Sequence, residues 1–265
     1  MEFKNETDRY DQHFLIDQEI VKRFISEARL VEEDIVVEIG PGKGTLTQLI
    51  ASKVKKMYVI ELDKRLEKFL KEIARQNPNI ELIFDNALDT FIPKCTKIIT
   101  SLPYSIIEPF INKMLKCEFQ ELLMITGARY AHAVLENKLT KLSLLTNCYF
   151  TTEKILDIIP EAFEPKPRVL STMIRLIPKT EAEITDQNIL IFRYLFKFRS
   201  QKLKNALVES LIRVFELKGK KLTQKEAKNL ISNLNISADL LDKEFSLISN
   251  LELESLHKKL SNLEL

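Results

Sequence analysis

The sequence predicts an α/β fold with a mostly parallel central sheet, followed by a small helical domain. Short apolar runs rich in β-branched residues alternate with amphipathic segments from about residue 35 to residue 130. The first run ends in a glycine-rich turn, and no strand-like run follows Pro178. Strands that alternate with helices form parallel sheets covered on both faces, and ligands bind outside the carboxyl ends of such strands.

The elements follow in order along the chain. The run Ile35–Ile39 is short and β-branched, and Gly40-Pro41-Gly42 closes it, which is typical of a buried strand. Residues 45–52 have helical spacing, and residues 64–75 place their apolar side chains on one helical face. Further strands are expected at residues 57–60, 80–84, 97–100 and 121–125.

The character of the chain changes after Pro178. The remainder has helical spacing, interrupted near Gly219 and near residues 233–235. We therefore expect one domain over residues 1–180 and a smaller helical domain over residues 181–265.

The composition, 45% hydrophobic and 29% charged, is that of a globular protein. No run of eighteen apolar residues and no apolar leader is present, which predicts a cytoplasmic protein without a membrane partner. The three cysteines are far apart and lack CxxC spacing, so we expect neither disulfides nor a metal site. The stretch from Arg193 to Lys228 contains eleven Lys or Arg and three Glu. Its net charge is therefore +8, and the rest of the chain has a net charge of −6. This favours a surface that faces a polyanion, and a solvated helix face is the alternative.

The turn after the first strand has the character of a ligand-binding turn. Glycine lets the backbone bend tightly and approach a ligand closely. A carboxylate at Glu38, just before the turn, would repel a phosphate at the helix N-terminus and suits a zwitterionic amino acid that carries a sulfonium. Glu61, at the tip of the second strand, is placed to accept hydrogen bonds from two ribose hydroxyls. A structural turn with two solvated glutamates is the alternative.

Two further strand ends provide candidate residues. The third strand ends in Asp85 and Asn86, where a side chain is expected to accept a hydrogen bond from an adenine amine. Asn86 can accept through its amide oxygen, Asp85 is the alternative, and either can instead cap a turn. The fourth strand runs into Ser101-Leu102-Pro103-Tyr104. The position of Tyr104 beside a proline at a strand end favours a stacking platform over core packing.

Several blocks of sequence carry a resemblance that spans nearly the whole chain. They are Gln12–Leu15, Val37–Gly42, Val59–Asp63, Leu102–Tyr104, Pro160–Val169 with Ser171, and Phe198–Leu207. In this order they resemble the ribosomal RNA adenine dimethylase family, which includes the small-subunit rRNA dimethylases and the erythromycin-resistance methylases. The last two blocks resemble the small-subunit branch most closely.

The resemblance implies a Rossmann-like methyltransferase domain that uses S-adenosylmethionine. Family members transfer two methyl groups to the exocyclic amine of adjacent adenines near the 3′ end of small-subunit rRNA. The target base leaves its stack, and acceptors aimed at its amine favour a tetrahedral nitrogen in line with the donor.

Carried over residue by residue, Ser101 and the carbonyl of Leu102 are the acceptors, Pro103 fixes the turn, and Tyr104 stacks on the base. His13 and Leu15 are expected to contact the cofactor mainly through their backbone. The expected cofactor-binding residues are His13, Leu15, Glu38, Gly40, Gly42, Glu61, Asp85, Asn86 and Ser101.

Some positions depart from the family pattern. Ser101 stands where the family usually has Asn, and Asn86 stands where it usually has Asp. Thr126 and Ala128 replace the Gln and Glu that usually line the target-base side in the family. A lost transition-state contact costs about 10²–10³ in rate, which predicts weakened methyl transfer. One alternative is a member that binds rRNA as a small-subunit assembly factor with little or no methylation. Another is a methyltransferase for a different acceptor.

The expected partner is small-subunit rRNA or a precursor ribosomal particle, bound by a monomer. Phe163 is expected either to sandwich the target base or to pack in the core. A helical basic cluster, brought together by i, i+4 spacing, is expected to contact phosphates without reading sequence. The cluster consists of Arg193, Lys197, Arg199, Lys202 and Lys204.

Overall fold

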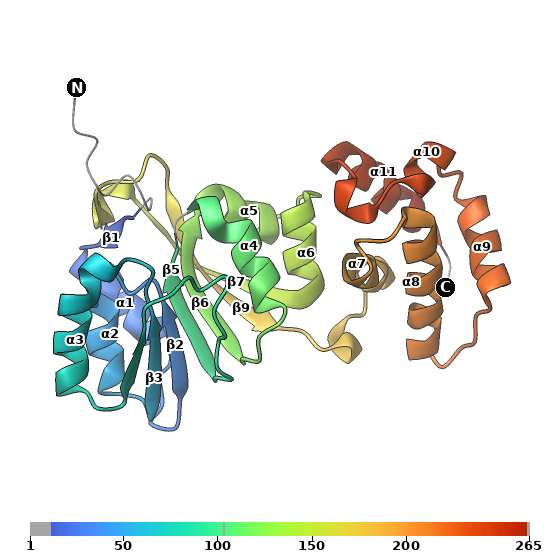
Figure 1. The fold of residues 1–265 in the computed structure, drawn as a ribbon. Helices are drawn as coiled ribbons and strands as arrows, with labels where there is room; N and C mark the ends of the chain where they lie inside the picture. The colour runs from blue at the N-terminus through green and yellow to red at the C-terminus, as the bar shows by residue number, and fades with distance from the viewer. Residues whose placement is uncertain (1–11, 103, 264–265) are drawn as a thin grey trace. The chain divides into compact units, whose positions relative to one another are not determined.

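The apolar runs of the sequence form neighbouring strands of one sheet (Figure 1). The strands are β2 (Ile35–Ile39), β3 (Lys56–Ile60), β4 (Ile80–Ile83), β5 (Lys97–Ser101), β6 (Glu121–Gly127), β7 (Phe150–Ile158) and β9 (Ser171–Pro178). The computed structural model describes residues 12–102 and 104–263, and within them the sheet has seven strands in the order β4-β3-β2-β5-β6-β9-β7. The pairs from β4 to β6 are parallel and β9 is antiparallel to β6. The predicted α/β class with a mostly parallel sheet is confirmed.

Helices cover both faces of this sheet because its central strands are apolar on both sides. In Figure 1, α1 (Gln18–Glu27), α2 (Thr45–Ala51) and α3 (Glu67–Gln76) lie on one side, and α4 (Ile107–Met114) and α5 (Ala128–Leu135) on the other. A short antiparallel ribbon pairs β1 (Phe14–Leu15) with β8 (Phe163–Glu164).

Strand β9 carries a fully buried arginine. The Arg175 guanidinium donates hydrogen bonds to Glu121 at 3.0 Å, to Glu27 at 3.0 Å and to Glu153. A buried charge is tolerated when opposite charges and hydrogen bonds surround it. This charged residue interrupts the apolar run of β9, which explains why the sequence analysis assigned no strand to residues 171–178.

The described chain divides into an α/β unit and a helical unit. The α/β unit extends to Leu135 and resumes from Thr152 to Pro178, and the helical unit consists of Glu136–Thr151 and the chain from Lys179 onward. This division differs from the linear one expected between residues 180 and 181. Among the described residues, no helix has the length and apolar character needed to span a bilayer.

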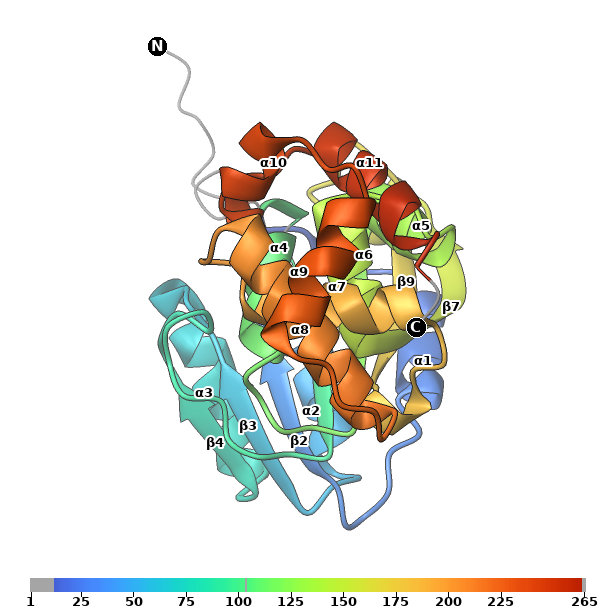
Figure 2. The same cartoon turned by 90° about the vertical axis from the view of Figure 1, so that its right-hand side faces the viewer.

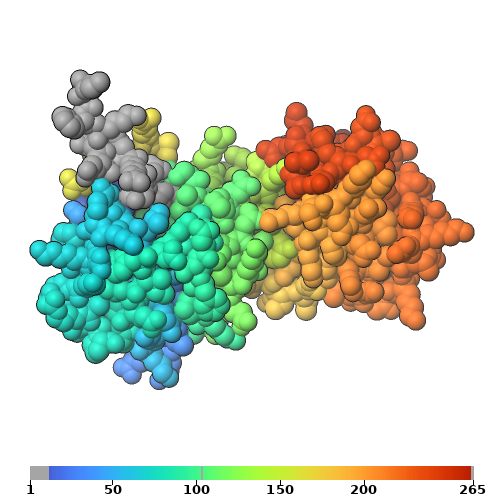
Figure 3. Space-filling model, viewed as in Figure 1, coloured from blue at the N-terminus to red at the C-terminus, as the bar shows by residue number. Residues whose placement is uncertain are grey.

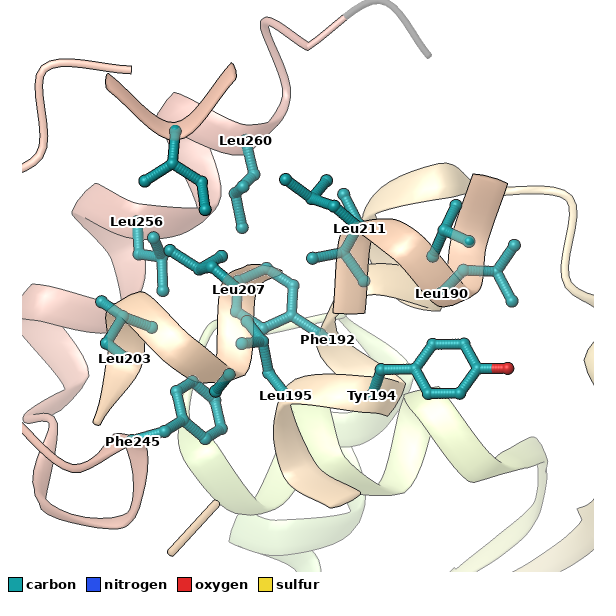
Figure 4. Packing of buried hydrophobic residues seen from close by; sticks show 14 of the residues in the cluster. Leu190, Phe192, Tyr194, Leu195, Leu203, Leu207, Leu211, Phe245, Leu256 and Leu260 are labelled. Atoms are coloured by element: carbon teal, nitrogen blue, oxygen red, sulfur yellow. The ribbon is translucent and has the colours of Figure 1, made fainter. Parts of the chain in front are cut away.

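The helical unit has its own apolar core. Its helices are α6 (Lys141–Tyr149), α7 (Gln187–Lys197), α8 (Leu203–Leu217), α9 (Gln224–Asn233), α10 (Ala238–Asp242) and α11 (Asn250–Leu260). Figure 4 shows Phe192, Leu207 and Leu256 packed together, and α6 contributes Leu144 and Cys148 to the same core. Because α6 precedes β7 in the chain, only the contacts in the structure reveal that it belongs to this unit.

Candidate active site

The loops at the carboxyl ends of β2, β3, β4 and β5 meet around a cavity of about 330 Å³ in the α/β unit. Glu61 and Tyr104, from loops far apart in sequence, line this same cavity. The described lining does not include Leu15 or Glu38, and Pro103 lies outside the described residues. The expected residues that do line the cavity are His13, Gly40, Gly42, Glu61, Asp85, Asn86, Ser101, Leu102, Tyr104 and Phe163.

The glycine turn after β2 is held against the ribbon of β1. Gly42 has a φ of 59°, and a Cβ there would lie 2.8 Å from Cδ1 of Phe14. The Lys43 ammonium lies 5.2 Å from the centre of the Phe14 ring. Only glycine therefore allows the aromatic ring to cover the turn in this backbone conformation.

Glu61 presents a nearly buried carboxylate to the cavity. The side chain is 4% exposed, and it accepts hydrogen bonds from the backbone N–H of Asp63 at 2.7 Å and of Gly42 at 3.3 Å. Burial raises the pKa of Glu61, and the two N–H donors oppose that rise because they favour the charged form. A carboxylate fixed at a cavity wall suits a ligand with neighbouring hydroxyl groups.

Glu38 faces inward below the turn. Its side chain is 2% exposed and accepts a hydrogen bond from the Thr47 hydroxyl at 2.5 Å, which ties β2 to α2. Burial raises the pKa of Glu38 to about 8. This carboxyl was expected to face a ligand, and the described cavity lining does not include it.

The structure separates the two candidates at the end of β4. The Asn86 amide oxygen accepts the N–H of Leu88 at 3.0 Å, and its amide nitrogen donates to Asp89 at 2.6 Å. Asn86 therefore caps a turn, as the sequence alternative allowed. Asp85 is exposed and lines the cavity, and its carboxylate accepts the N–H of Asn86 at 2.8 Å. Of the two side chains, Asp85 keeps more accepting capacity for a ligand amine.

Tyr104 is anchored on the strands beside the cavity. Its hydroxyl lies 2.5 Å from Oγ of Ser171, at the start of β9. Its ring packs on Gly127, where a Cβ would lie 3.2 Å from Cγ of the tyrosine. The His13 ring is stacked at 6.3 Å between ring centres, and its Nδ1–H donates to the Pro165 carbonyl at 2.7 Å. These contacts fix the plane of an aromatic ring at the cavity wall.

Replacing Ser171 with alanine is expected to lower the rate of any reaction that uses the Tyr104 ring by about 2- to 10-fold, the worth of one hydrogen bond. Tyr104→Phe is expected to have a similar effect because it removes the same bond from the other side. Rates of both single variants and of the double variant measure the coupling. Fully additive losses would contradict the pairing, because residues in contact are non-additive.

The remaining target-side candidates are largely enclosed, and for Phe163 core packing was one of the two expectations. Phe163 is 3% exposed and belongs to the α/β core while also lining the cavity. Thr126 is fully buried and Ala128 is 9% exposed, and the described cavity lining includes neither. Of the four positions expected to depart from the family pattern, Ser101 and Asn86 line the cavity.

The expected basic cluster does not form a single helical face. Helix α7 ends at Lys197 and α8 begins at Leu203, so Arg199 and Lys202 lie in the connection between them. The Arg193 guanidinium donates to the Cys148 carbonyl at 2.9 Å and lies 4.4 Å from the centre of the Tyr149 ring. Arg193 thus holds α7 to α6 inside the helical unit.

Two more members of that cluster share one carboxylate. Lys202 lies 3.4 Å and Lys204 2.7 Å from the same Asp242 oxygen. Part of their charge is therefore compensated within the unit. The i, i+4 spacing does not bring these residues onto one helical face, because the helix is broken between Lys197 and Leu203.

Sequence reasoning missed several residues that line the cavity. Gln12 and Phe14 lie in the segment before α1, which has no strand or helix periodicity, and the resemblance of the block Gln12–Leu15 to the family was the available signal. Leu62, Ser105 and Ile106 directly follow expected site residues, so their proximity to the strand ends was the available signal.

The glycine turn, the acidic strand tip and the sheet order define a Rossmann-like methyltransferase. Among solved structures, a dimethyladenosine transferase from Plasmodium falciparum has a TM-score of 0.64 at 22% identity, covering 93% of this chain and 98% of that one. The 23S rRNA methyltransferase ErmE has a TM-score of 0.61 at 21% identity, covering 94% and 100%. Similarity at this level of identity supports the fold.

The sequence comparisons identify the family. The family model described as "Ribosomal RNA adenine dimethylase" matches residues 3–241. A "Probable ribosomal RNA small subunit methyltransferase A" from Methanosarcina barkeri is 33% identical over 258 residues, which are 91% of this chain and 90% of the relative. The relative of the same name from Methanococcoides burtonii is 34% identical over 207 residues, which are 76% and 77% of the two chains. The chain belongs to the ribosomal RNA adenine dimethylase family.

This family uses S-adenosylmethionine as its methyl donor. The cavity fits that cofactor because its wall offers a carboxylate at Glu61, a glycine turn and an acceptor at Asp85. These are the groups that a nucleoside linked to an amino acid requires. The resemblance stated from the sequence is thereby confirmed at the level of family and cofactor.

Proposed function

We propose that this protein is a small-subunit rRNA adenine N6,N6-dimethyltransferase that acts in ribosome biogenesis. The observation that carries the proposal is the single cavity in which Glu61, on the cofactor side, and Tyr104, on the target side, face the same space. Family membership and the names of the curated relatives support the same substrate. We propose further that the protein acts as a monomer in the cytoplasm, on a precursor ribosomal particle.

The chain's residues divide the work between two ends of the cavity. Glu61 would accept hydrogen bonds from the two ribose hydroxyls of the cofactor, and Asp85 would accept one from its adenine amine. The backbone of the Gly40–Gly42 turn would lie close to the cofactor. When bound, S-adenosylmethionine supplies a methyl group on a positively charged sulfur. On the target side, Tyr104 would stack on the target adenine after it has left the duplex. The aromatic ring would then replace the stacking that the base loses on extrusion.

Ser101 and the Leu102 carbonyl would aim the target amine. Both follow the end of β5, where the N–H of Leu102 donates to the Ile125 carbonyl at 3.3 Å and fixes the strand end. Acceptors that form hydrogen bonds with the two amine protons make the nitrogen tetrahedral. Its lone pair is then no longer delocalised into the ring and can point toward the methyl donor. Catalysis of this kind depends on positioning and electrostatics, because no residue has to become covalently attached.

Mass spectrometry of nucleosides from small-subunit rRNA tests the proposal. Precursor particles from cells that lack the modification would be incubated with the protein and methyl-labelled cofactor. We expect labelled N6,N6-dimethyladenosine, in an amount that depends on the protein concentration. Cofactor binding without any methylated adenine would contradict the proposal and favour a protein that only binds rRNA.

Ser101 is proposed to make methyl transfer slower than an asparagine would. A serine hydroxyl is shorter than an amide and reaches less far toward the target amine. Ser101→Asn is expected to raise the methylation rate by up to about tenfold, the worth of one good hydrogen bond. Ala128→Glu serves as the comparison, because Ala128 is outside the described cavity lining and the change should not accelerate the reaction. If only Ala128→Glu raised the methylation rate, the slow transfer would be due to Ala128 and not to Ser101.

A further inference from the structure

Exposed lysines of the helical unit gather where α8 turns into α9. In both ribbon views α8 and α9 lie side by side, and Figure 3 shows the orange atoms of α9 at the surface. The lysines here form a group that we call the α8–α9 lysine surface. Its members are Lys218, Lys220, Lys221, Lys225 and Lys228, all of them exposed.

The acidic residues of this segment do not neutralise the group. Glu216 accepts a hydrogen bond from Arg213 at 2.9 Å. Glu226 accepts the N–H of Thr223 at 2.8 Å and its hydroxyl at 2.7 Å, which caps the start of α9. Among the described residues, no ion pair joins the α8–α9 lysine surface to a carboxylate. Residues 213–228 contain six Lys or Arg against two Glu.

Many other surface lysines of the protein are paired within the chain. Lys22 lies 2.8 Å from Glu19, and Lys71 lies 2.6 Å from Glu67. In the helical unit, Lys202 and Lys204 share Asp242. The α8–α9 lysine surface is therefore open to an anionic partner from outside the described chain.

The framework below these charges is firmly packed. Ala227 and Ile231 of α9 are buried in the helical core, whereas Lys225 and Lys228, one turn apart, are exposed to solvent. At the end of α8, the N–H of Lys220 donates to the Phe215 carbonyl at 2.9 Å. Three of the lysines therefore lie in the connection that follows α8, and two lie on α9 itself.

We propose that the α8–α9 lysine surface binds phosphate groups of the RNA backbone. The proposal rests on the proposed function, since it takes its occupant to be the rRNA substrate. Residues 214–228 contain no arginine, the residue suited to bidentate contacts, whereas the lysine ammonium acts as a point charge. Such a surface adds affinity and orientation without reading base sequence. It lies within the basic stretch from Arg193 to Lys228 but outside the cluster from Arg193 to Lys204, where phosphate contacts were expected.

The salt dependence of RNA binding tests this assignment. Full-length protein in which all five lysines are changed to glutamine would be titrated with small-subunit rRNA over a range of salt concentrations. Each phosphate contact contributes about 0.7–0.9 to the slope of log K against log salt. We expect the slope to fall by about 2–4 and the affinity at physiological salt to fall by roughly 100-fold. The affinity for free S-adenosylmethionine should not change.

A matched variant controls for net charge. Glutamine would replace five lysines of the α/β unit that each lie within 4.0 Å of a surface glutamate, namely Lys22, Lys55, Lys56, Lys71 and Lys94. This control loses the same charge, and its slope should stay close to that of the unaltered protein. Equal slopes for the two variants would overturn the proposal. The proposal would also be overturned if the variant of the α8–α9 lysine surface lost binding to anionic vesicles but kept its affinity for RNA. Circular dichroism would verify that both variants are folded.

The two proposals fail in different ways. If the protein methylates rRNA adenine but the slope is unchanged, only the assignment of the lysine surface is wrong. If the slope falls as expected but no adenine is methylated, the surface assignment stands and the proposed function fails.

Discussion

Replacing Tyr104 with alanine is expected to lower methyl transfer to rRNA by at least about 100-fold while leaving the affinity for S-adenosylmethionine nearly unchanged. Base stacking on an aromatic ring contributes roughly 1–3 kcal/mol, and a misplaced reacting group costs about a further 100-fold. The Ser171 hydrogen bond and the Gly127 contact hold this ring in one plane at the cavity wall. Single-turnover methylation and cofactor calorimetry measure the two quantities separately.

Tyr104→Phe is the control for this experiment. It keeps the stacking face and loses only the bond to Ser171, so the loss of rate should stay within about 2- to 10-fold. If the phenylalanine variant were as slow as the alanine variant, the hydroxyl rather than the ring face would be essential. If the alanine variant retained normal methylation, Tyr104 would have no role at the target base.

Glu61→Gln is expected to weaken S-adenosylmethionine binding by about 30- to 150-fold. Hydrogen bonds to a charged carboxylate are about twice as strong as neutral ones, so two ribose contacts would lose roughly 2–3 kcal/mol. Because burial raises the pKa of Glu61, its carboxylate gains a proton at a higher pH than an ordinary glutamate does. On acidification, cofactor affinity should therefore begin to fall at a higher pH than an ordinary glutamate would give, and the glutamine variant should lack this contribution.

Glu81→Gln is the matched control. Glu81 lies on β4 beside β3, is exposed, and pairs with Lys56 at 2.9 Å. Calorimetry should give this variant the affinity of the unaltered protein. Equal losses for both variants, or none for Glu61→Gln, would remove Glu61 from the cofactor site. Thermal denaturation of each variant separates loss of binding from loss of fold.

The parallel strands could be predicted because their signals are local. The run Ile35–Ile39 needs both faces buried, and its β-branched residues and closing glycines announce this in the sequence itself. The antiparallel strand β9 could not be found in the same way. Its buried Arg175 is explained only by Glu27, Glu121 and Glu153, which come from three other parts of the chain.

The candidate site shows the same limit. Strand ends predict which loops meet, and Glu61, Asp85, Ser101 and Tyr104 do line one cavity. Sequence does not show which way a side chain turns. Glu38 turned out to bond Thr47 below the turn, and Arg193 to bond the Cys148 carbonyl inside the helical unit. Both orientations depend on partners that no local pattern specifies.

The placement of α6 means that the protein cannot be dissected by trimming one end. A fragment that stops at Pro178 would keep α6 but lose α7 and α8, against which Leu144 and Cys148 are packed. Its apolar side chains would then meet water, and the fragment would tend to aggregate. Isolating the α/β unit would require excising residues 136–151 and rejoining the chain. The α/β unit and the helical unit are therefore interleaved along the sequence and do not follow one another.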